Sequence, residues 1–247
     1  MIFEDRVQAG QQLAQKLGAY AGKTDVVVLG IPRGGVPVAF EVAKVLRAPL
    51  DIFLSRKLGV PGQEELAFGA LASGGVRVLD RGLIRELNLS KEEIDRIAET
   101  VKKELERRER VYRGDRPPIK IEGKVTLLID DGIATGSSMR AGIKALRQMK
   151  PSRLVVAVPV APLHTCKRMK SEVDELVCVY TPEFFYAIGQ FYEDFSQVSD
   201  EEVTELLHRA QSVNSSRPDT GSPTMDAVDE SSRQSFPPRD APGWIRS

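Results

Sequence analysis

Short apolar runs alternate with segments of helical periodicity along most of this chain. The runs have the length of single strands and fit strands that are buried on both faces of a parallel sheet. They lie at residues 26–31, 50–54, 125–129, 154–160 and 175–180. Apolar residues at helical spacing occupy residues 3–18, 37–46, 90–112, 137–149, 162–170 and 199–208. The alternation predicts one doubly wound α/β domain with a mostly parallel sheet and with ligands at the carboxyl ends of the strands.

Two further segments predict a small cover beside this sheet. Apolar residues at 65–72 and 76–80 flank Ser73-Gly74-Gly75, which indicates a hairpin at the sheet edge. Residues 181–195 are rich in Phe and Tyr. This aromatic segment either covers an acceptor site, where its rings stack on a base, or forms a core or dimer patch. The candidate acceptor contacts are Phe185, Tyr186, Phe191 and Tyr192.

The strand predicted at 125–129 ends in two acids and a loop of small residues. Asp130 and Asp131 are followed by Gly132 and Ile133 and then by the candidate phosphate-binding residues Ala134, Thr135, Gly136, Ser137 and Ser138. Small residues let a ligand approach the backbone, and unpaired N–H groups at a helix start favour an anion. Two carboxylates would repel a bare phosphate, so we expect them to face sugar hydroxyls or a hydrated Mg²⁺. The combination indicates a sugar phosphate; the alternative is a strand that happens to end in two acids.

A second anion-binding loop is predicted where the strand at 26–31 runs into Pro32-Arg33-Gly34-Gly35. Glycines free the backbone to turn its N–H groups toward a ligand, and Arg33 supplies a guanidinium fork. A purely structural turn is the alternative. Residues 55–62 place Arg56 and Lys57 before a Gly/Pro-rich stretch, which indicates a mobile loop that closes over a polyanion, or else a solvated turn.

Composition excludes several other classes of protein. Neither the NTP-binding string Gly-x₄-Gly-Lys-Ser/Thr nor the dinucleotide fingerprint Gly-x-Gly-x-x-Gly occurs. The chain has 35 basic and 35 acidic residues, and the charged run at 102–113 is expected to be a solvated helix face, so no nucleic-acid partner is predicted. The two cysteines give neither a zinc spacing nor a disulfide framework. No apolar run has the length of a membrane span and no signal peptide begins the chain, so we expect a cytoplasmic protein without membrane contact.

The composition changes at Gln211. Fifteen of the last 37 residues are Ser, Pro or Gly, and apolar periodicity ends. We therefore expect a folded domain at residues 1–210 and a disordered Ser/Pro-rich tail at 211–247.

The apolar strand, acid pair and Thr-Gly loop together resemble the 5-phosphoribosyl 1-pyrophosphate (PRPP) motif of type I phosphoribosyltransferases. The resemblance covers roughly residues 1–208 and is closest to an uncharacterised bacterial branch of predicted phosphoribosyltransferases with the strings PRGG, RKLGxPG, ELAFGA and DDGxATG. It implies that Asp130 and Asp131 hold the ribose hydroxyls, directly or through Mg²⁺. It implies that residues 134–138 bind the 5-phosphate. Arg33, Gly34 and Gly35 would bind pyrophosphate, with a cis peptide bond near Arg33–Gly34, while Arg56 and Lys57 would begin the loop that closes over it.

The resemblance implies a transferase of nucleotide metabolism that acts as a homodimer. Such an enzyme moves the 5-phosphoribosyl group of PRPP to a nitrogen acceptor, a nucleobase or a related compound, and releases pyrophosphate with the help of Mg²⁺. The catalytic set would be Arg33, Arg56, Lys57, Asp130 and Asp131. Ala134 replaces the Asp of 6-oxopurine enzymes, and the strand at 154–160 lacks their lysine, so hypoxanthine or guanine transfer is disfavoured. Two alternatives are a regulatory protein that binds PRPP or a nucleotide without turnover, and a hydrolase or phosphorylase of ribose phosphates.

Overall fold

A five-stranded sheet forms the centre of the structure, a computed structural model that describes residues 2–60 and 62–215. Its order is β2-β1-β6-β7-β8, and all neighbouring strands pair in parallel. The strands are β1 (Val26–Gly30), β2 (Leu50–Ile52), β6 (Val125–Ile129), β7 (Arg153–Val160) and β8 (Glu175–Tyr180). The strands in the middle of the sheet are buried almost throughout. The predicted doubly wound, mostly parallel α/β fold is therefore confirmed.

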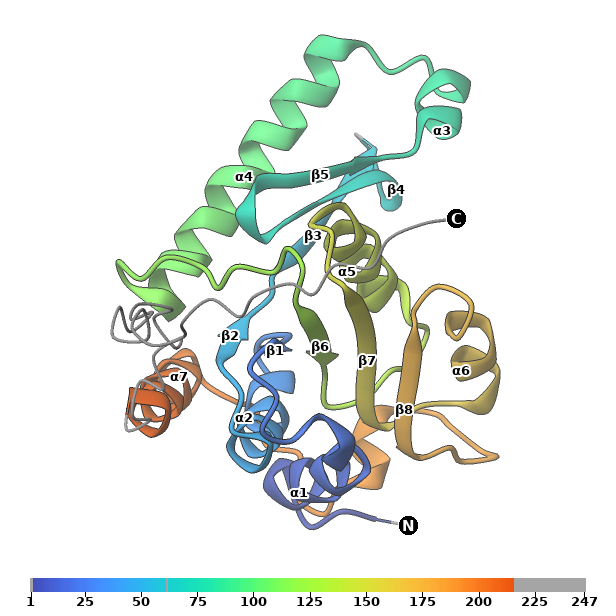
Figure 1. Ribbon diagram of the computed structural model, residues 1–247. Coiled ribbons are helices and arrows are strands. Elements are labelled where there is room, and N and C mark those ends of the chain that lie inside the picture. The colour runs from blue at the N-terminus through green and yellow to red at the C-terminus, as the bar shows by residue number, and fades with distance from the viewer. Residues whose placement is uncertain (1, 61, 216–247) are drawn as a thin grey trace, which may run out of the picture. The chain divides into compact units, whose positions relative to one another are not determined.

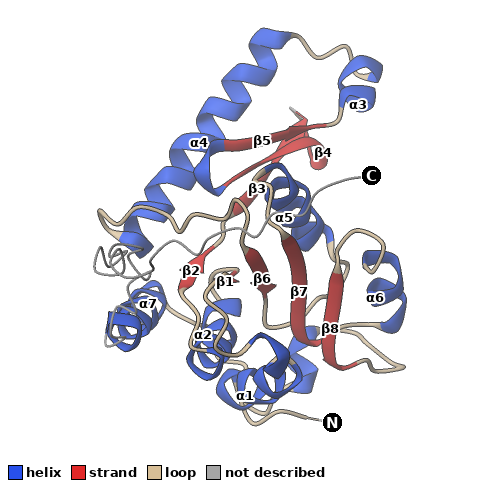
Figure 2. Cartoon of the chain, in the orientation of Figure 1, coloured by secondary structure: helices blue, strands red, loops and turns tan. Residues whose placement is uncertain are grey.

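Helices cover both faces of this sheet (Figures 1 and 2). On one face α1 (Arg6–Lys16), α2 (Gly35–Leu46) and α7 (Asp200–Ser215) pack against alternate residues of β1, β6 and β7. On the other face α5 (Ser137–Gln148) and α6 (Leu163–Met169) pack against the remaining positions of the same strands. Short 3₁₀ turns lie at Gly18–Tyr20, Ser73–Gly75 and Ile188–Phe191. Alternation along each strand thus feeds two separate apolar clusters, as a doubly wound sheet requires.

A second sheet replaces the mobile loop that the sequence predicts after β2. Its antiparallel strands are β3 (Ser55–Val60), β4 (Gln63–Ala72) and β5 (Val76–Leu79), in the order β3-β4-β5. The hairpin of β4 and β5 is present, but it belongs to this sheet and not to the edge of the main one. Leu58 and Val60 are buried beside Phe68, and this apolar contact explains why residues 55–60 adopt a strand. Arg56 and Lys57 therefore project from a β-strand.

The long helix α4 (Lys91–Arg113) lies against the second sheet and is anchored to the first. It begins with the predicted capping box, in which Ser90 and Glu93 bond each other's backbone N–H. At its other end the Arg113 Nε donates to Asp51 Oδ1 over 2.8 Å, and both side chains are buried. The prediction of a solvated face over 102–113 is therefore wrong at Arg113, whose charge is paired with a carboxylate of β2. The helix α3 (Arg81–Glu86), capped by Asp80, was not predicted.

The last helix runs beyond the predicted end of the domain. Helix α7 continues to Ser215, so residues 211–215 extend a helix that was expected to end near His208. The rest of the predicted tail, residues 216–247, lies outside the described residues, and its disorder stays a prediction.

Candidate functional site

The two predicted anion loops contact each other at the carboxyl ends of β1 and β6. Gly34 lies against the side chain of Asp131, so closely that a Cβ at Gly34 would overlap Asp131 Oδ2. Gly35 lies against Asp130, and a Cβ there would be 2.8 Å from both Asp130 Cα and Ile129 O. Only glycine fits at either position. The glycines of the first loop and the acids of the second therefore form one continuous site.

A cis peptide bond occurs in the first loop, one residue before the expected place. It joins Pro32 to Arg33, whereas the resemblance implied Arg33–Gly34.

Asp131 is held from two sides by Arg6, which the sequence did not suggest, and by Tyr192, which it suggested only as an acceptor contact. Arg6 Nε donates to Asp131 Oδ2 over 2.9 Å, and the two side chains are only 11% and 12% exposed. Tyr192 Oη donates to the backbone oxygen of Asp131 over 2.6 Å. Arg6 also donates to Ser196 O over 2.8 Å and lies 4.0 Å from the centre of the Phe195 ring. The first helix and the aromatic segment together fix the position of the second acid.

Burial keeps the charged forms of the two acids unfavourable. It raises the pKa of Asp130 well above the ordinary value, and the neighbouring Asp131 charge raises it further. Burial also raises the pKa of Asp131, although the hydrogen bond and charge of Arg6 act in the opposite direction. Only the backbone N–H of Asp131 donates to the Asp130 carboxylate from the described part of the chain, over 2.9 Å. Asp130 thus retains lone pairs for a ligand that brings hydroxyl donors or positive charge.

The candidate phosphate loop, residues 134–138, is exposed where a ligand would contact it. Gly136 has φ 78° and packs under Met169, and Thr165 Oγ1 donates to Ala134 O over 3.0 Å, so α6 supports the loop from below. The hydroxyls of Thr135, Ser137 and Ser138 are exposed and make no hydrogen bond to any described residue. This loop keeps its hydroxyl donors available.

The helices that follow the two loops lack side-chain caps, but their first N–H groups differ. In α2 the N–H groups of Gly35 and Val36 donate to Ile31 O and Arg33 O, and residue 37 is Pro, whereas no described residue accepts from the first N–H groups of α5. Gly34 and Gly136 occupy the N-cap positions of α2 and α5, and neither helix has a side-chain cap. By contrast, Asp5, Asp80 and Ser90 cap α1, α3 and α4. The uncapped N–H groups of α5, at the positive end of the helix dipole, are suited to bind an anion.

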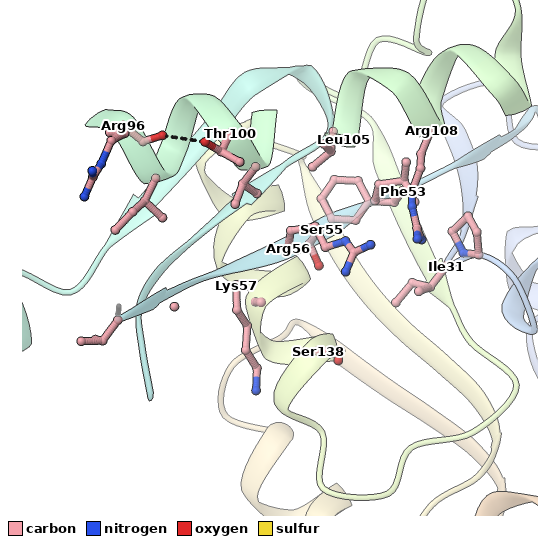
Figure 3. Close-up of a pocket in the computed structure, with 17 residues that line it drawn as sticks. Ile31, Phe53, Ser55, Arg56, Lys57, Arg96, Thr100, Leu105, Arg108 and Ser138 are labelled. Atoms are coloured by element: carbon pink, nitrogen blue, oxygen red, sulfur yellow. Dashed lines mark hydrogen bonds between the residues drawn. The ribbon is translucent and has the colours of Figure 1, made fainter. Parts of the chain in front are cut away.

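A cavity of about 840 Å³ opens beside these loops, between β3, α4 and the start of α5 (Figure 3). Of the predicted site residues, Arg56, Lys57 and Ser138 line it, as does Pro32 of the first loop. Figure 3 shows Arg56 and Lys57 extending from β3, with Ser138 on the facing helix α5. Arg96 and Arg108 of α4 add two cations, and none of the described residues that line the cavity is an acid. Arg108 thus lines the cavity while its side chain stays 43% exposed, so the prediction of a solvated face holds there but omitted this contact.

The remaining predicted residues lie around this cavity and not on its wall. Arg33 points toward α7, where its Nη1 lies 3.8 Å from Asp200 Oδ1, and it lines a smaller cavity of about 220 Å³ with Arg107 and Arg108. The two cavities share Pro32 and Arg108. The structure therefore brings Arg33 next to the cationic side of the site, but not onto the acid pair.

The aromatic segment has mainly a structural role at this point of the fold. Phe191 and Tyr192 are buried in a cluster with Phe3, and Phe185 stacks on Phe191 with ring centres 5.4 Å apart. Tyr186 is 88% exposed, but neither it nor the other three aromatic candidates lines either cavity. The interpretation as a core patch is favoured for Phe191 and Tyr192. Acceptor contact stays a prediction for Phe185 and Tyr186.

The acid pair fits a Mg²⁺ ion that is shared with a phosphorylated ligand. Mg²⁺ keeps several waters and usually binds one or two carboxylates together with phosphate oxygens. Asp130 offers such a carboxylate between the turn at residues 32–35 and the open N-terminus of α5. The described residues contain no group of three or more His, Cys, Asp or Glu that could hold a metal alone. The donor set therefore matches a metal that is completed by its ligand.

Sequence reasoning missed Arg6, Arg96 and the hydroxyl of Tyr192. Arg96 could have been found, because it lies one position before Ile97 of the apolar stripe that faces β3. Arg6 could not, since its partner is 125 residues away. Among residues 2–60 and 62–215, no helix is both long enough and apolar enough to cross a membrane.

Comparison with known proteins agrees with this geometry. The model of the phosphoribosyl transferase domain matches residues 2–196. Two Mycobacterium tuberculosis proteins, "Putative phosphoribosyl transferase MT0597" (strain CDC 1551) and "Putative phosphoribosyl transferase Rv0571c" (strain H37Rv), are each 47% identical over 209 residues. These alignments cover 85% of this chain and 47% of each relative, so the chain spans about half the length of these curated relatives.

A solved structure is similar over nearly its whole length. The crystal structure of TT1426 from Thermus thermophilus shares 42% identity, with a TM-score of 0.76, and the match covers 85% of this chain and 99% of that one. The matched segment 2–196 contains both loops, the acid pair and the residues that line the large cavity. The chain therefore belongs to the phosphoribosyl transferase domain family.

Proposed function

We propose that this protein transfers the 5-phosphoribosyl group of PRPP to a nitrogen acceptor and releases pyrophosphate. The observation that carries the proposal is the direct contact of Gly34 and Gly35 with Asp131 and Asp130. PRPP has a phosphate at one end, a pyrophosphate at the other and a diol between them. The open N-terminus of α5 and the glycine turn at residues 32–35 lie on either side of an acid pair, which matches this order of chemical groups.

Each group of residues has a separate role in this proposal. Asp130 and Asp131 accept hydrogen bonds from the ribose hydroxyls. The backbone and hydroxyls of residues 134–138 bind the 5-phosphate, and the turn at residues 32–35 binds pyrophosphate. The cations Arg56 and Lys57 of β3 line a cavity with Pro32 of this turn, and Arg108 of α4 lines a second cavity with Arg33 of the turn.

Catalysis would come mainly from placing positive charge around the departing pyrophosphate. Substitution at the anomeric carbon passes through a transition state with oxocarbenium character, in which negative charge grows on the leaving group. Arg56, Lys57 and Arg108 are positioned to stabilise that charge. A bound Mg²⁺ would neutralise further charge on the pyrophosphate oxygens. Asp130 and Asp131 would orient the ribose so that its face opposite the pyrophosphate meets the acceptor.

Several finer points belong to the same proposal. The resemblance supports Mg²⁺ as the metal, a homodimer as the working assembly, nucleotide metabolism as the setting and the cytoplasm as the location. A nucleobase or a related nitrogen compound is the acceptor class, and a 6-oxopurine is disfavoured because residue 134 is Ala.

The test is pyrophosphate release by the purified chain with PRPP and Mg²⁺, across a panel of nucleobases and small amines. Release that requires one acceptor supports a transferase. Release without any acceptor would contradict it in favour of a hydrolase. Tight PRPP binding without release from any acceptor would contradict it in favour of a regulatory protein. The double variant Asp130→Asn/Asp131→Asn should remain folded and lose Mg²⁺-dependent PRPP binding, and wild-type binding by it would remove the site assignment.

A further inference from the structure

The two cysteines of the chain contact each other across the interface of α6 and β8, which lie side by side (Figure 1). Cys166 belongs to α6 and Cys178 to β8, and both side chains pack against the same apolar cluster. Their thiols form a hydrogen bond with each other. Both are free thiols, and the sequence contains no third cysteine. Each thiol therefore has the other as its one possible disulfide partner within the molecule.

The two thiols differ in their reactivity. The hydrogen bond from Cys178 lowers the pKa of Cys166 below its ordinary value. The same hydrogen bond, together with burial, raises the pKa of Cys178, whose proton has a second acceptor in Tyr180 O at 3.1 Å. The thiolate is the form that attacks an oxidant, and Cys166 is partly exposed, so a small oxidant can reach its sulfur. Cys166 is thus the thiol that reacts first, and Cys178 is the thiol that reacts with the product.

The residues around Cys166 support the candidate phosphate loop. Thr165, the residue before it, is buried, and its Oγ1 donates to Ala134 O over 3.0 Å. Met169, nearly one turn later, packs under Gly136, where a Cβ would lie 2.8 Å from Met169 Cε. Helix α6 has only seven residues, so a movement of Cys166 is passed to both contacts.

We propose that Cys166 and Cys178 form a reversible disulfide when the protein meets a peroxide, and that this modification loosens the phosphate loop. The disulfide is independent of the proposed phosphoribosyl transfer, and only its effect on PRPP binding rests on that function. The sulfurs must approach to about 2.05 Å, which is closer than two hydrogen-bonded thiols lie. Strand β8 is held in the sheet by its pairing with β7, so α6 moves, and Thr165 and Met169 move with it.

The reaction balances with hydrogen peroxide as the oxidant. The Cys166 thiolate attacks one peroxide oxygen, the O–O bond breaks, and the products are a sulfenic acid on Cys166 and hydroxide. Hydroxide takes up the proton that Cys166 had released and becomes water. The Cys178 sulfur then attacks the Cys166 sulfur, and the hydroxyl group leaves with the Cys178 proton as a second water. The two thiols lose two electrons, the peroxide gains them, and a dithiol reductant reverses the bond by exchange.

The first experiment detects the disulfide itself. The purified chain is treated with hydrogen peroxide, its remaining thiols are blocked with N-ethylmaleimide, and the intact mass and the linked peptides are measured. The wild type should lose both reactive thiols together and yield one peptide pair joined through Cys166 and Cys178, and dithiothreitol should restore both thiols. Cys178→Ser should stop at a sulfenic acid on Cys166, which dimedone traps. Cys166→Ser should keep its thiol at the same dose of peroxide.

The second experiment measures the loop by hydrogen exchange without any ligand. The peptide that covers residues 133–140 contains the N–H groups of Ile133 and Arg140, which donate to Val160 O and Gly136 O. Their exchange should be about threefold to tenfold faster in the oxidised wild type than in the reduced one, the factor expected for one lost hydrogen bond. The affinity for PRPP should fall by a similar factor. The double variant Cys166→Ser/Cys178→Ser is the matched control, and peroxide should change neither its exchange nor its affinity.

Three results would overturn the proposal. The first is separate oxidation of each cysteine, or two free thiols in the treated wild type. The second is a disulfide between two molecules, visible as a dimer on a non-reducing gel. The third is a disulfide within one molecule that leaves the exchange of residues 133–140 unchanged. The wild type alone decides all three, so the proposal stays testable even where a variant does not fold. Failure of the proposed function differs, because the reduced wild type would then not bind PRPP while the mass and exchange results would stand.

Discussion

Arg6 and Asp131 form a buried ion pair that joins the first helix to the acid pair at the end of β6. Their closest atoms, Nε and Oδ2, are 2.9 Å apart, and both side chains are almost fully enclosed. Gly34 packs on the same carboxylate. The side chain of Asp131 therefore contacts both the turn at residues 32–35 and the N-terminal helix. A ligand that uses Asp131 thus meets a carboxylate whose position and charge Arg6 controls.

Replacement of this arginine should destabilise the protein. Arg6→Gln leaves the Asp131 carboxylate buried without its cation, and loss of one partner of a buried ion pair costs about 3–5 kcal/mol. Urea unfolding at pH 7 measures the change in the free energy of unfolding. Arg147→Gln is a suitable control, since its pair with Asp174 is 2.8 Å long but more than a third exposed, and such pairs contribute about 0–1 kcal/mol. Equal losses in both variants would show that Arg6 is not a buried partner of Asp131.

The two acids should respond to different extents to the removal of charge. Asp130 has a pKa raised by burial and by its neighbour, so the folded protein binds a proton there more tightly than the unfolded chain. Stability must then fall as the pH rises from about 4, the usual Asp pKa, through the raised value. Asp130→Asn removes this loss and should raise the free energy of unfolding at pH 7. Asp131→Asn should raise it less, because the hydrogen bond and charge of Arg6 oppose the rise in the pKa of Asp131.

Unfolding of the wild type and both variants across pH 5 to 8 checks this contrast. The curve of Asp130→Asn should depend less on pH than that of the wild type. A lower stability of Asp130→Asn at pH 7 would mean that the carboxylate is favourably paired in the folded state.

The two loop glycines should tolerate no side chain. At Gly35 a new Cβ would meet backbone atoms, Asp130 Cα and Ile129 O, each at 2.8 Å, and backbone cannot move without disturbing β6. At Gly34 the obstacle is the Asp131 carboxylate, which a methyl group would displace from Arg6. We expect Gly35→Ala to lower the thermal unfolding temperature more than Gly34→Ala does, and both to weaken PRPP binding. Gly18→Ala is the control, because no atom lies within 4 Å of its added Cβ. A Gly35→Ala protein as stable as the control would contradict the contact between the loops.

The sequence predicted the main sheet well because its signals are local. Runs such as Val125–Ile129 are apolar on both faces, and the Ser90 capping box marks the start of α4 within four residues. Residues 55–60 were misjudged because two adjacent cations and nearby glycines suggested a loop. These residues form a strand because Leu58 is buried against Phe68 and Ile94, which lie later in the sequence.

The residues of the candidate site likewise fall into those that a local string reveals and those that only a distant contact places. Two short sequence strings contain the glycines and acids of the site, Gly34, Gly35, Asp130 and Asp131. The structure brings these strings into contact. Arg6 and Tyr192 gain their place from pairings across 125 and 61 residues, which no local pattern reveals. The cationic cavity likewise depends on α4 lying against β3, so its arginines looked like an ordinary solvated face.

Calorimetric titration of PRPP into the wild type and into Asp130→Asn, with and without Mg²⁺, tests the central claim most directly. We expect PRPP to bind the wild type far more tightly with Mg²⁺ than without it, and this binding to be lost in a variant that is at least as stable as the wild type. The same Mg²⁺-dependent affinity in both proteins would contradict the account, because the acid pair would then not be where the ribose and its metal are bound.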